Sequence, residues 1–119
     1  MAAASDHIEI TETLVRLYVF LAQTLDRCLD HSQQEAFPER DHQAFLTDTR
    51  AKLLSMVSVN VVVKAKVEEE CRRVLELTER YMKAEGTKTA LKEEVKAERA
   101  IFETKLIALS DLLAVFRAR

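Results

Sequence analysis

A single glycine, Gly86, and a single proline, Pro38, interrupt a chain of 119 residues. Sheet-rich folds need many tight turns, and tight turns depend on clusters of Gly, Pro, Asn and Asp. Apolar residues make up 48% of the chain and charged residues 32%, which is typical of a folded domain rather than of a disordered segment. The sequence therefore predicts an all-α fold, built as a single helical domain over residues 1–119.

Hydrophobic periodicity predicts three long helices, at about residues 8–34, 38–85 and 89–116, with residues 1–6 flexible. Pro38 and Gly86 mark the two connections, because proline starts a new helix readily and glycine ends one. Short connections make neighbouring helices antiparallel. We therefore expect an antiparallel bundle, in which apolar residues of the first helix share one face: Ile10, Leu14, Leu17, Leu21, Leu25 and Cys28.

The middle segment is the uncertain part of this architecture. As one helix, residues 38–85 would be about 70 Å long beside neighbours of about 40–45 Å. Ser58 and Asn60 compete for backbone hydrogen bonds, and the surrounding valines have a low helix propensity. The segment is therefore either one helix, kinked or split near 58–60 to give four in all, or a helix interrupted by a strand. Val57, Val59, Val61 and Val63 alternate as in a strand, but no other stretch of the chain could pair with it, so a strand would need a second molecule. We therefore favour the helix.

Charge and targeting signals narrow the range of partners and compartments. The net charge is −2, whereas a nucleic-acid-binding surface needs an excess of basic residues. The chain has no apolar run long enough to span a membrane and no secretory signal at its start. Cys28 and Cys71 have neither metal-type nor redox-type spacing, so we expect reduced thiols packed in the core of an intracellular, cytoplasmic protein.

Catalysis and metal binding find no support in the sequence. His7, His31 and His42 lack the spacing of metal ligands, and a chain with one glycine cannot form a glycine-rich phosphate loop. We therefore predict no enzyme activity, no cofactor, no metal and no small-molecule substrate.

Two sets of charged residues have a structural interpretation instead. The pairs Glu68–Arg72 and Glu69–Arg73 are spaced for ion pairs along one solvated helix face. Glu98 lies in register with the apolar residues of the last helix. It should therefore find a basic partner, set the packing register as a polar group, or lie at an edge with its stem packed.

The sequence predicts a protein that binds other proteins. Three long helices with wide apolar faces cannot cover them all, so we expect self-association or a helical partner, as in a coiled coil. The leading hypothesis is a structural or adaptor subunit, and the alternative is a small chaperone that presents an apolar groove to a client segment. The expected partner-binding residues belong to the valine segment and to the last helix: Val57, Val59, Val61, Ile107, Leu112 and Val115.

Overall fold

The computed structural model describes residues 2–31, 39–58, 60–84 and 89–118, with the side chains of 7–29, 43–58, 60–84 and 89–118. These residues form four helices: α1 (Ala2–His31), α2 (Glu39–Val57), α3 (Val61–Lys83) and α4 (Thr89–Arg117). No strand occurs among them, so the all-α prediction is confirmed and the strand alternative near residue 59 is wrong.

The middle segment is split into two helices at the position that the sequence indicated. Ser58 closes α2, because its backbone N–H and its hydroxyl both donate to the carbonyl oxygen of Leu54. Asn60 then starts α3 from an extended conformation, with its side chain accepting from the N–H groups of Val62 at 2.8 Å and Val63 at 3.2 Å. The bonds of Ser58 are those of a helical residue, whereas Asn60 makes the N-cap bonds that start a new helix in place of a continuous one.

The other boundaries are close to those predicted. Helix α1 begins at Ala2, six residues before the predicted start and inside the stretch that was expected to be flexible. Helix α3 ends at Lys83, where the N–H of Ala84 donates to the carbonyl of Arg80 at 3.1 Å. Helix α4 begins at Thr89, as predicted, and ends at Arg117. The connections at Pro38 and Gly86 lie outside the described residues.

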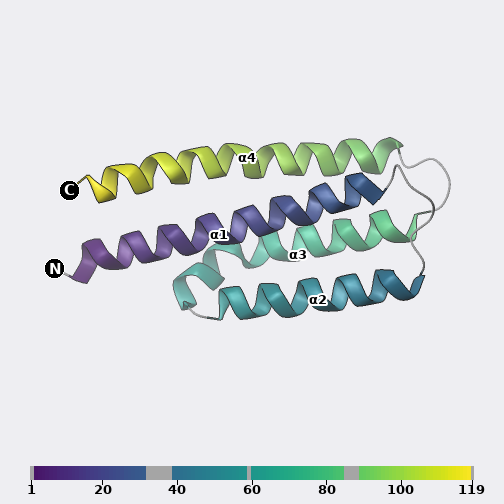
Figure 1. The fold of residues 1–119 in the computed structure, drawn as a ribbon, viewed down its shortest axis with the longest axis horizontal. Coiled ribbons are helices and arrows are strands. Elements are labelled where there is room, and N and C mark those ends of the chain that lie inside the picture. The colour runs from purple at the N-terminus through teal and green to yellow at the C-terminus, as the bar shows by residue number, and fades with distance from the viewer. Residues whose placement is uncertain (1, 32–38, 59, 85–88, 119) are drawn as a thin grey trace.

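The helices run antiparallel to their neighbours in sequence, so both ends of the chain lie at the same end of the molecule (Figure 1). Helices α1 and α3 each contact the other three helices. The most extensive contact is between α1 and α4, whereas the backbones of α3 and α4 approach each other at few places. The result is an elongated bundle of 55 × 24 × 19 Å.

The core lies mainly between α1 and α3 and extends to one face of α4. The apolar face predicted for the first helix is buried from Leu14 to Cys28, with Ile10 partly buried against it. Helix α3 contributes a matching face with the expected spacing of three or four residues: Val67, Cys71, Val74, Thr78 and Tyr81. Periodicity therefore predicted correctly which faces meet.

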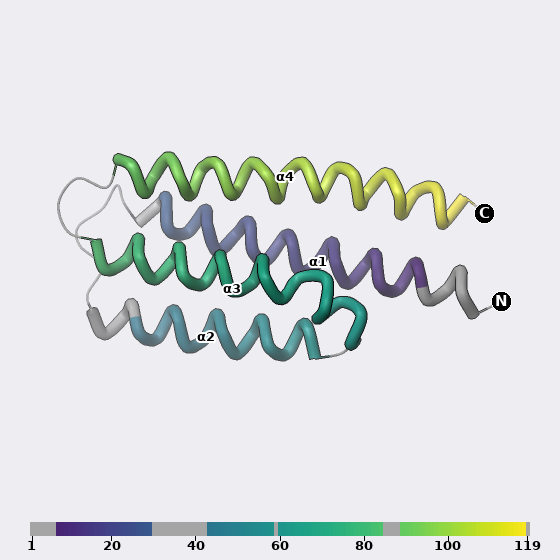
Figure 2. Tube along the Cα trace, turned by 180° about the vertical axis from the view of Figure 1, so that it is seen from behind, coloured from purple at the N-terminus to yellow at the C-terminus, as the bar shows by residue number. Residues whose placement is uncertain are grey.

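The split reverses the length mismatch expected from the sequence. Helices α2 and α3 have 19 and 23 residues, whereas α1 and α4 have 30 and 29. The outer end of the pair α1–α4 therefore extends past the turn between α2 and α3 (Figures 1 and 2). Two contacts connect α1 and α4 there. The rings of His7 and Phe116 stack with their centroids 5.8 Å apart, and Arg117 forms an ion pair with Glu12 at 3.1 Å.

Candidate functional site

The six residues predicted to bind partners do not form one surface. Val57 is buried in the core and presents no surface to a partner, because α2 turns it inward in its last turn. Val59 lies outside the described residues. Val61 is exposed at the start of α3. The other three are exposed on α4, so this helix carries the surface that merits description: Ile107, Leu112 and Val115.

Helix α4 has an inner face that docks on the bundle and an outer face that does not. The inner face buries Val95, Phe102 and Leu113. On the outer face, Ile101, Leu112 and Val115 expose 45%, 43% and 49% of their surface. At about 100° per residue, these three and the exposed Ala108 lie within roughly 60° of one another. The spacing of seven from residue 101 to 108 and from 108 to 115 is that of a coiled-coil contact face.

Ile107 belongs to another side of α4. It is 60% exposed, but it lies roughly 120° around the helix from Ile101. The sequence prediction grouped it with Leu112 and Val115 because that end of the helix is apolar nearly all round. It omitted Ile101, although the seven-residue spacing was there to find it.

We call the outer face the α4 seam and define it by seven residues: Ile101, Thr104, Lys105, Ala108, Asp111, Leu112 and Val115. The hydroxyl of Thr104 donates to the carbonyl of Ala100 at 3.1 Å, so its polar group already has a partner. Asp111 makes no ion pair with any residue that the structure describes. The seam is therefore apolar along its centre, with one base and one acid beside it.

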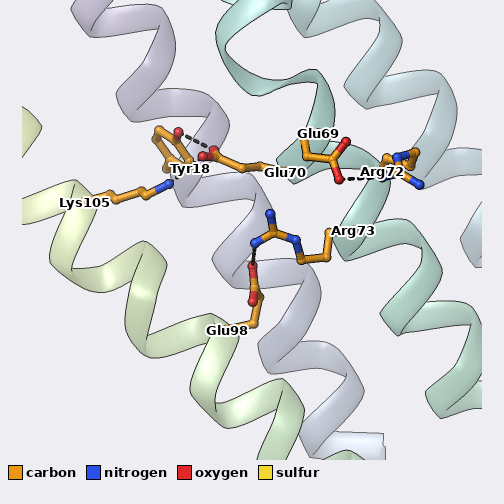
Figure 3. A network of polar contacts seen from close by, with 7 residues as sticks. All are labelled: Tyr18, Glu69, Glu70, Arg72, Arg73, Glu98 and Lys105. Carbon is orange, nitrogen blue, oxygen red and sulfur yellow. Dashed lines mark hydrogen bonds and ion pairs between the residues drawn. The ribbon is translucent and has the colours of Figure 1, made fainter.

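Next to the seam, ion pairs connect α3 to α4. Among the described residues these are Arg80–Glu94, with hydrogen bonds of 3.2 and 3.4 Å, Arg73–Glu98 at 3.2 Å, and Lys105–Glu70. We call these pairs the α3–α4 ion-pair row. Glu98 is the carboxylate that the sequence singled out, and the prediction that it finds a base is confirmed: its side chain is only 12% exposed and accepts from Arg73 (Figure 3).

The predicted pairing of the acidic run is wrong in detail. Arg72 pairs with Glu69 and with Glu76 rather than with Glu68. Arg73 does not pair with Glu69, because it lies on the side of α3 that faces α4. It donates instead to the largely buried Glu98. Figure 3 shows the two arginines pointing to different partners.

Glu70 joins three helices at one point. It accepts from the hydroxyl of Tyr18 on α1 and from the ammonium of Lys105 on α4 (Figure 3). The Lys105 nitrogen also lies 5.5 Å from the centroid of the Tyr18 ring, within the range of a cation–π contact. Glu70 is 15% exposed at its side chain, so this charge is largely shielded from water and its two partners fix its position.

The ionisable groups around Glu70 hold their protons. Burial, reinforced by the hydrogen bond and the charge of Glu70, raises the pKa of Tyr18 above its ordinary value. Burial and the same charge raise the pKa of the Cys71 thiol to about 11. A thiol becomes a nucleophile as the thiolate, so at neutral pH neither group is activated for covalent chemistry. The arrangement stabilises the contact of α1, α3 and α4.

Helix α3 runs beside most of the seam but does not cover it, because the two helices are connected mainly through the long side chains of the ion-pair row. Along the ion-pair row, each step toward the start of α3 corresponds to a step toward the end of α4. Continuing this antiparallel register places the first residue of α3, Val61, opposite about Leu112. Val62 shares a helix face with Arg73 and Arg80 and is itself exposed, so it borders the open end of the seam.

A second surface feature lies between α1 and α2. It is a groove of about 520 Å³, in which Lys52 lies 4.6 Å from the ring centroid of Phe20 and Arg27 lies 5.9 Å from that of Phe45. The buried hydroxyls of Thr24 and Thr49 in its lining donate to backbone carbonyls of their own helices. The cations already cover the two rings, so the groove does not present the converging free polar groups of a ligand site.

Two further searches concern metals and membranes. No group of three or more His, Cys, Asp or Glu side chains in the described part of the chain is placed to hold a metal ion. Over the same residues, no helix combines the length and the apolar character needed to cross a membrane. The side chains of His31 and His42 lie outside the described residues, and His7 stacks on Phe116.

Comparison of the chain with protein-family models, with curated proteins and with solved structures gave no match. The function is therefore inferred from the fold and the surfaces described above.

Proposed function

We propose that this protein is a non-catalytic helical interaction module that binds another helix along the α4 seam. The observation that supports this proposal is a row of exposed aliphatic side chains at seven-residue spacing, Ile101, Ala108 and Val115, with the exposed Leu112 beside it, on a helix whose inner face is already packed. Burying an aliphatic side chain of this size stabilises a complex by roughly 1.5–3 kcal/mol relative to full exposure. A partner that covers these side chains is therefore stabilised by apolar burial that is absent in the isolated chain.

Contacts on two sides of α4 hold the helix that carries the seam. Phe102 and Leu113 anchor the inner face of α4 in the core, and the ion-pair row attaches its flank to α3. A helix held on two sides loses little conformational freedom when a partner binds to a third. Apolar residues at seven-residue spacing are the pattern that a partner helix fits by knobs-into-holes packing. These observations favour a structural or adaptor role over catalysis.

Site-specific photo-crosslinking in the producing cells tests this proposal. A photoreactive phenylalanine derivative replaces Leu112 in one variant and Ile107 in a matched control, since both side chains are aliphatic, exposed and on the same helix. The proposal predicts that position 112 gives a discrete adduct, and that mass spectrometry maps it to a helical segment with apolar heptad spacing. Equal adduct patterns from the two positions, or none from position 112, would contradict it.

A further inference from the structure

Helix α2 is attached to the bundle by a narrower stripe of buried residues than α1 or α3. The described side chains that it buries are Leu46, Thr49, Leu53 and Val57, which lie within roughly 80° of one another at about 100° per residue. The buried residues of α1 and α3 extend over roughly 180° and 140° around their helices. Since the apolar stripe of a helix packed on a core is about 100° wide or more, α2 has little buried surface to hold it.

The two ends of α2 are attached differently. Leu53, near its last turn, belongs to the main apolar core, whereas Leu46 is buried outside that core. The ion pair of Arg50 with Glu79 shows the antiparallel register of α2 and α3. This register places Leu46 opposite about Met82, which is also buried apart from the main core. The first half of α2 therefore rests on a small separate contact, while its last turns adjoin the core.

The contact between α1 and α2 is incompletely filled. The groove of about 520 Å³ lies between them, whereas the side chains of closely packed helices interdigitate. The cation–π contacts across the groove come from Lys52 and Arg27, whose side chains are exposed, and such contacts are weak at exposed sites. The ion pair from α2 to α3 also lies at the surface, where such pairs contribute little. Polar contacts therefore add little to the narrow apolar stripe.

The other three helices do not depend on α2 for their own structure. Asn60, which lies beyond the end of α2, accepts from the N–H groups of Val62 and Val63. Val63 is fully buried in the main core, so the first turn of α3 is capped and anchored by residues outside α2. Helices α2 and α4 lie on opposite sides of the bundle (Figure 1), and their described residues do not approach each other. The packing of α4 on α1 is therefore kept when α2 leaves.

We propose that α2 is a lid, which opens as one unit by turning at the helix break before Asn60 while α1, α3 and α4 stay folded. Opening uncovers the part of α1 that lines the groove, including the buried Thr24, and the core surface against which Leu53 and Val57 pack. Segments with few buried apolar contacts are those that open locally in native proteins. The lid and the α4 seam are on different helices, so the two proposals stand or fall separately.

Native-state hydrogen exchange of the natural chain, in low concentrations of denaturant, measures this opening. Relative to their intrinsic rates, the amides from Leu46 to Leu53 should exchange at least about 100-fold faster than those in the middle of α1, α3 and α4. Their opening free energies should equal one another and fall less steeply with denaturant, because opening α2 alone exposes less surface than global unfolding. Equal protection in all four helices, or protection that rises steadily from one end of α2 as in fraying, would overturn the inference.

Two matched substitutions separate the opening of α2 from unfolding of the whole chain. Val95→Ala removes a buried valine side chain of α4, so it should accelerate exchange at least about 10-fold in the middle of α1, α3 and α4 and leave α2 unchanged. Val57→Ala, in α2, should accelerate exchange in all four helices, because both kinds of opening break its contacts. If Val95→Ala accelerates α2 as much as the rest, α2 opens only with the whole chain and the inference is overturned. If either variant fails to fold, the denaturant dependence of the natural chain decides.

Discussion

Helix α4 has two neighbouring regions that differ in what they contact. The α3–α4 ion-pair row is polar, and each of its residues on α4 has a partner on α3: Glu94, Glu98 and Lys105. The α4 seam shares Lys105 with this row, but its centre is aliphatic, and Ile101, Leu112 and Val115 are about half exposed. The difference shows how one helix can be fixed to its own chain and still present a face to another.

The two regions also differ in the kind of free energy that they supply. Ion pairs between exposed residues contribute about 0–1 kcal/mol each, so the exposed pair Arg80–Glu94 aligns α3 and α4 more than it stabilises them. The attachment of α4 depends on buried apolar residues, of which Phe102 is fully covered. Aliphatic side chains in the seam stabilise nothing further until another surface covers them.

The largest effect is expected from the packing beneath both regions. Phe102 is fully buried and its ring lies 5.6 Å from that of Tyr18, so Phe102→Ala should lower the free energy of unfolding by about 3–5 kcal/mol. Leu112→Ala should lower it by only about 1 kcal/mol in dilute protein, because Leu112 is 43% exposed and full burial of such a side chain is worth about 1.5–3 kcal/mol. Chemical denaturation measures both. Similar losses in the two variants would show that the seam is packed within its own chain.

Alkaline pH should weaken the three-helix junction. Tyr18 and Cys71 have pKa values raised above their ordinary values of 10.0 and 9.0, so above about pH 9 the unfolded chain releases protons that the folded chain keeps. The free energy of unfolding is therefore unaffected below pH 9 and falls as pH rises toward 11, by on the order of 1–2 kcal/mol after solvent screening. Denaturation at stepped pH measures this.

The variant Tyr18→Phe/Cys71→Ala serves as the control for the alkaline loss. Its decline between pH 9 and pH 11 should be smaller than that of the natural chain. An equal decline would show that the junction is not the source of the loss.

Among the ion-paired carboxylates of α3, removing a shielded charge should lower the free energy of unfolding more than removing an exposed one. Glu70→Gln removes a shielded charge that accepts from Tyr18 and Lys105 and should cost about 1–2 kcal/mol. Glu69→Gln, one residue away, removes a charge whose pair with Arg72 is exposed and should cost less than about 0.5 kcal/mol. Thermal denaturation of the two variants compares them. Equal costs would mean that Glu70 is no more important than a surface residue.

The smallest effect concerns the start of α3, which lies far from the packed inner face of α4. Asn60 accepts from two backbone N–H groups there, so Asn60→Ala should cost about 1 kcal/mol. Amide hydrogen exchange should accelerate in the first turn of α3 and not in α4. Unchanged exchange at Val62 and Val63 would show that the cap does not hold this end.

The sequence predicted the helices well because few residues could break them. The near absence of Gly and Pro gave the all-α class, and Ser58 and Asn60 marked the split through hydrogen bonds that they make in the structure. The inward direction of Val57 was missed, although it continues the buried face of α2 four residues after Leu53 and eight after Thr49. The alternation of the neighbouring valines obscured that helical spacing.

The candidate surface was predicted in part, for a geometric reason. Leu112 and Val115 were found because they lie outside the inner face of the last helix. Ile101 was missed and Ile107 was included, because exposure depends on which sides α1 and α3 occupy, and that follows from the tertiary contacts. The partners of Arg73 and Glu98 belong to different helices, so spacing along one helix could not reveal them.

The central claim is that the α4 seam is covered by protein when the chain functions, and hydroxyl-radical footprinting of the dilute purified chain and of the chain inside the producing cells tests it most directly. Ile101, Leu112 and Val115 should be modified in the dilute purified chain and protected in the cells, while Ile107 is modified equally in both. Equal modification of Leu112 in the two samples, or protection of Ile107 to the same degree, would contradict the account.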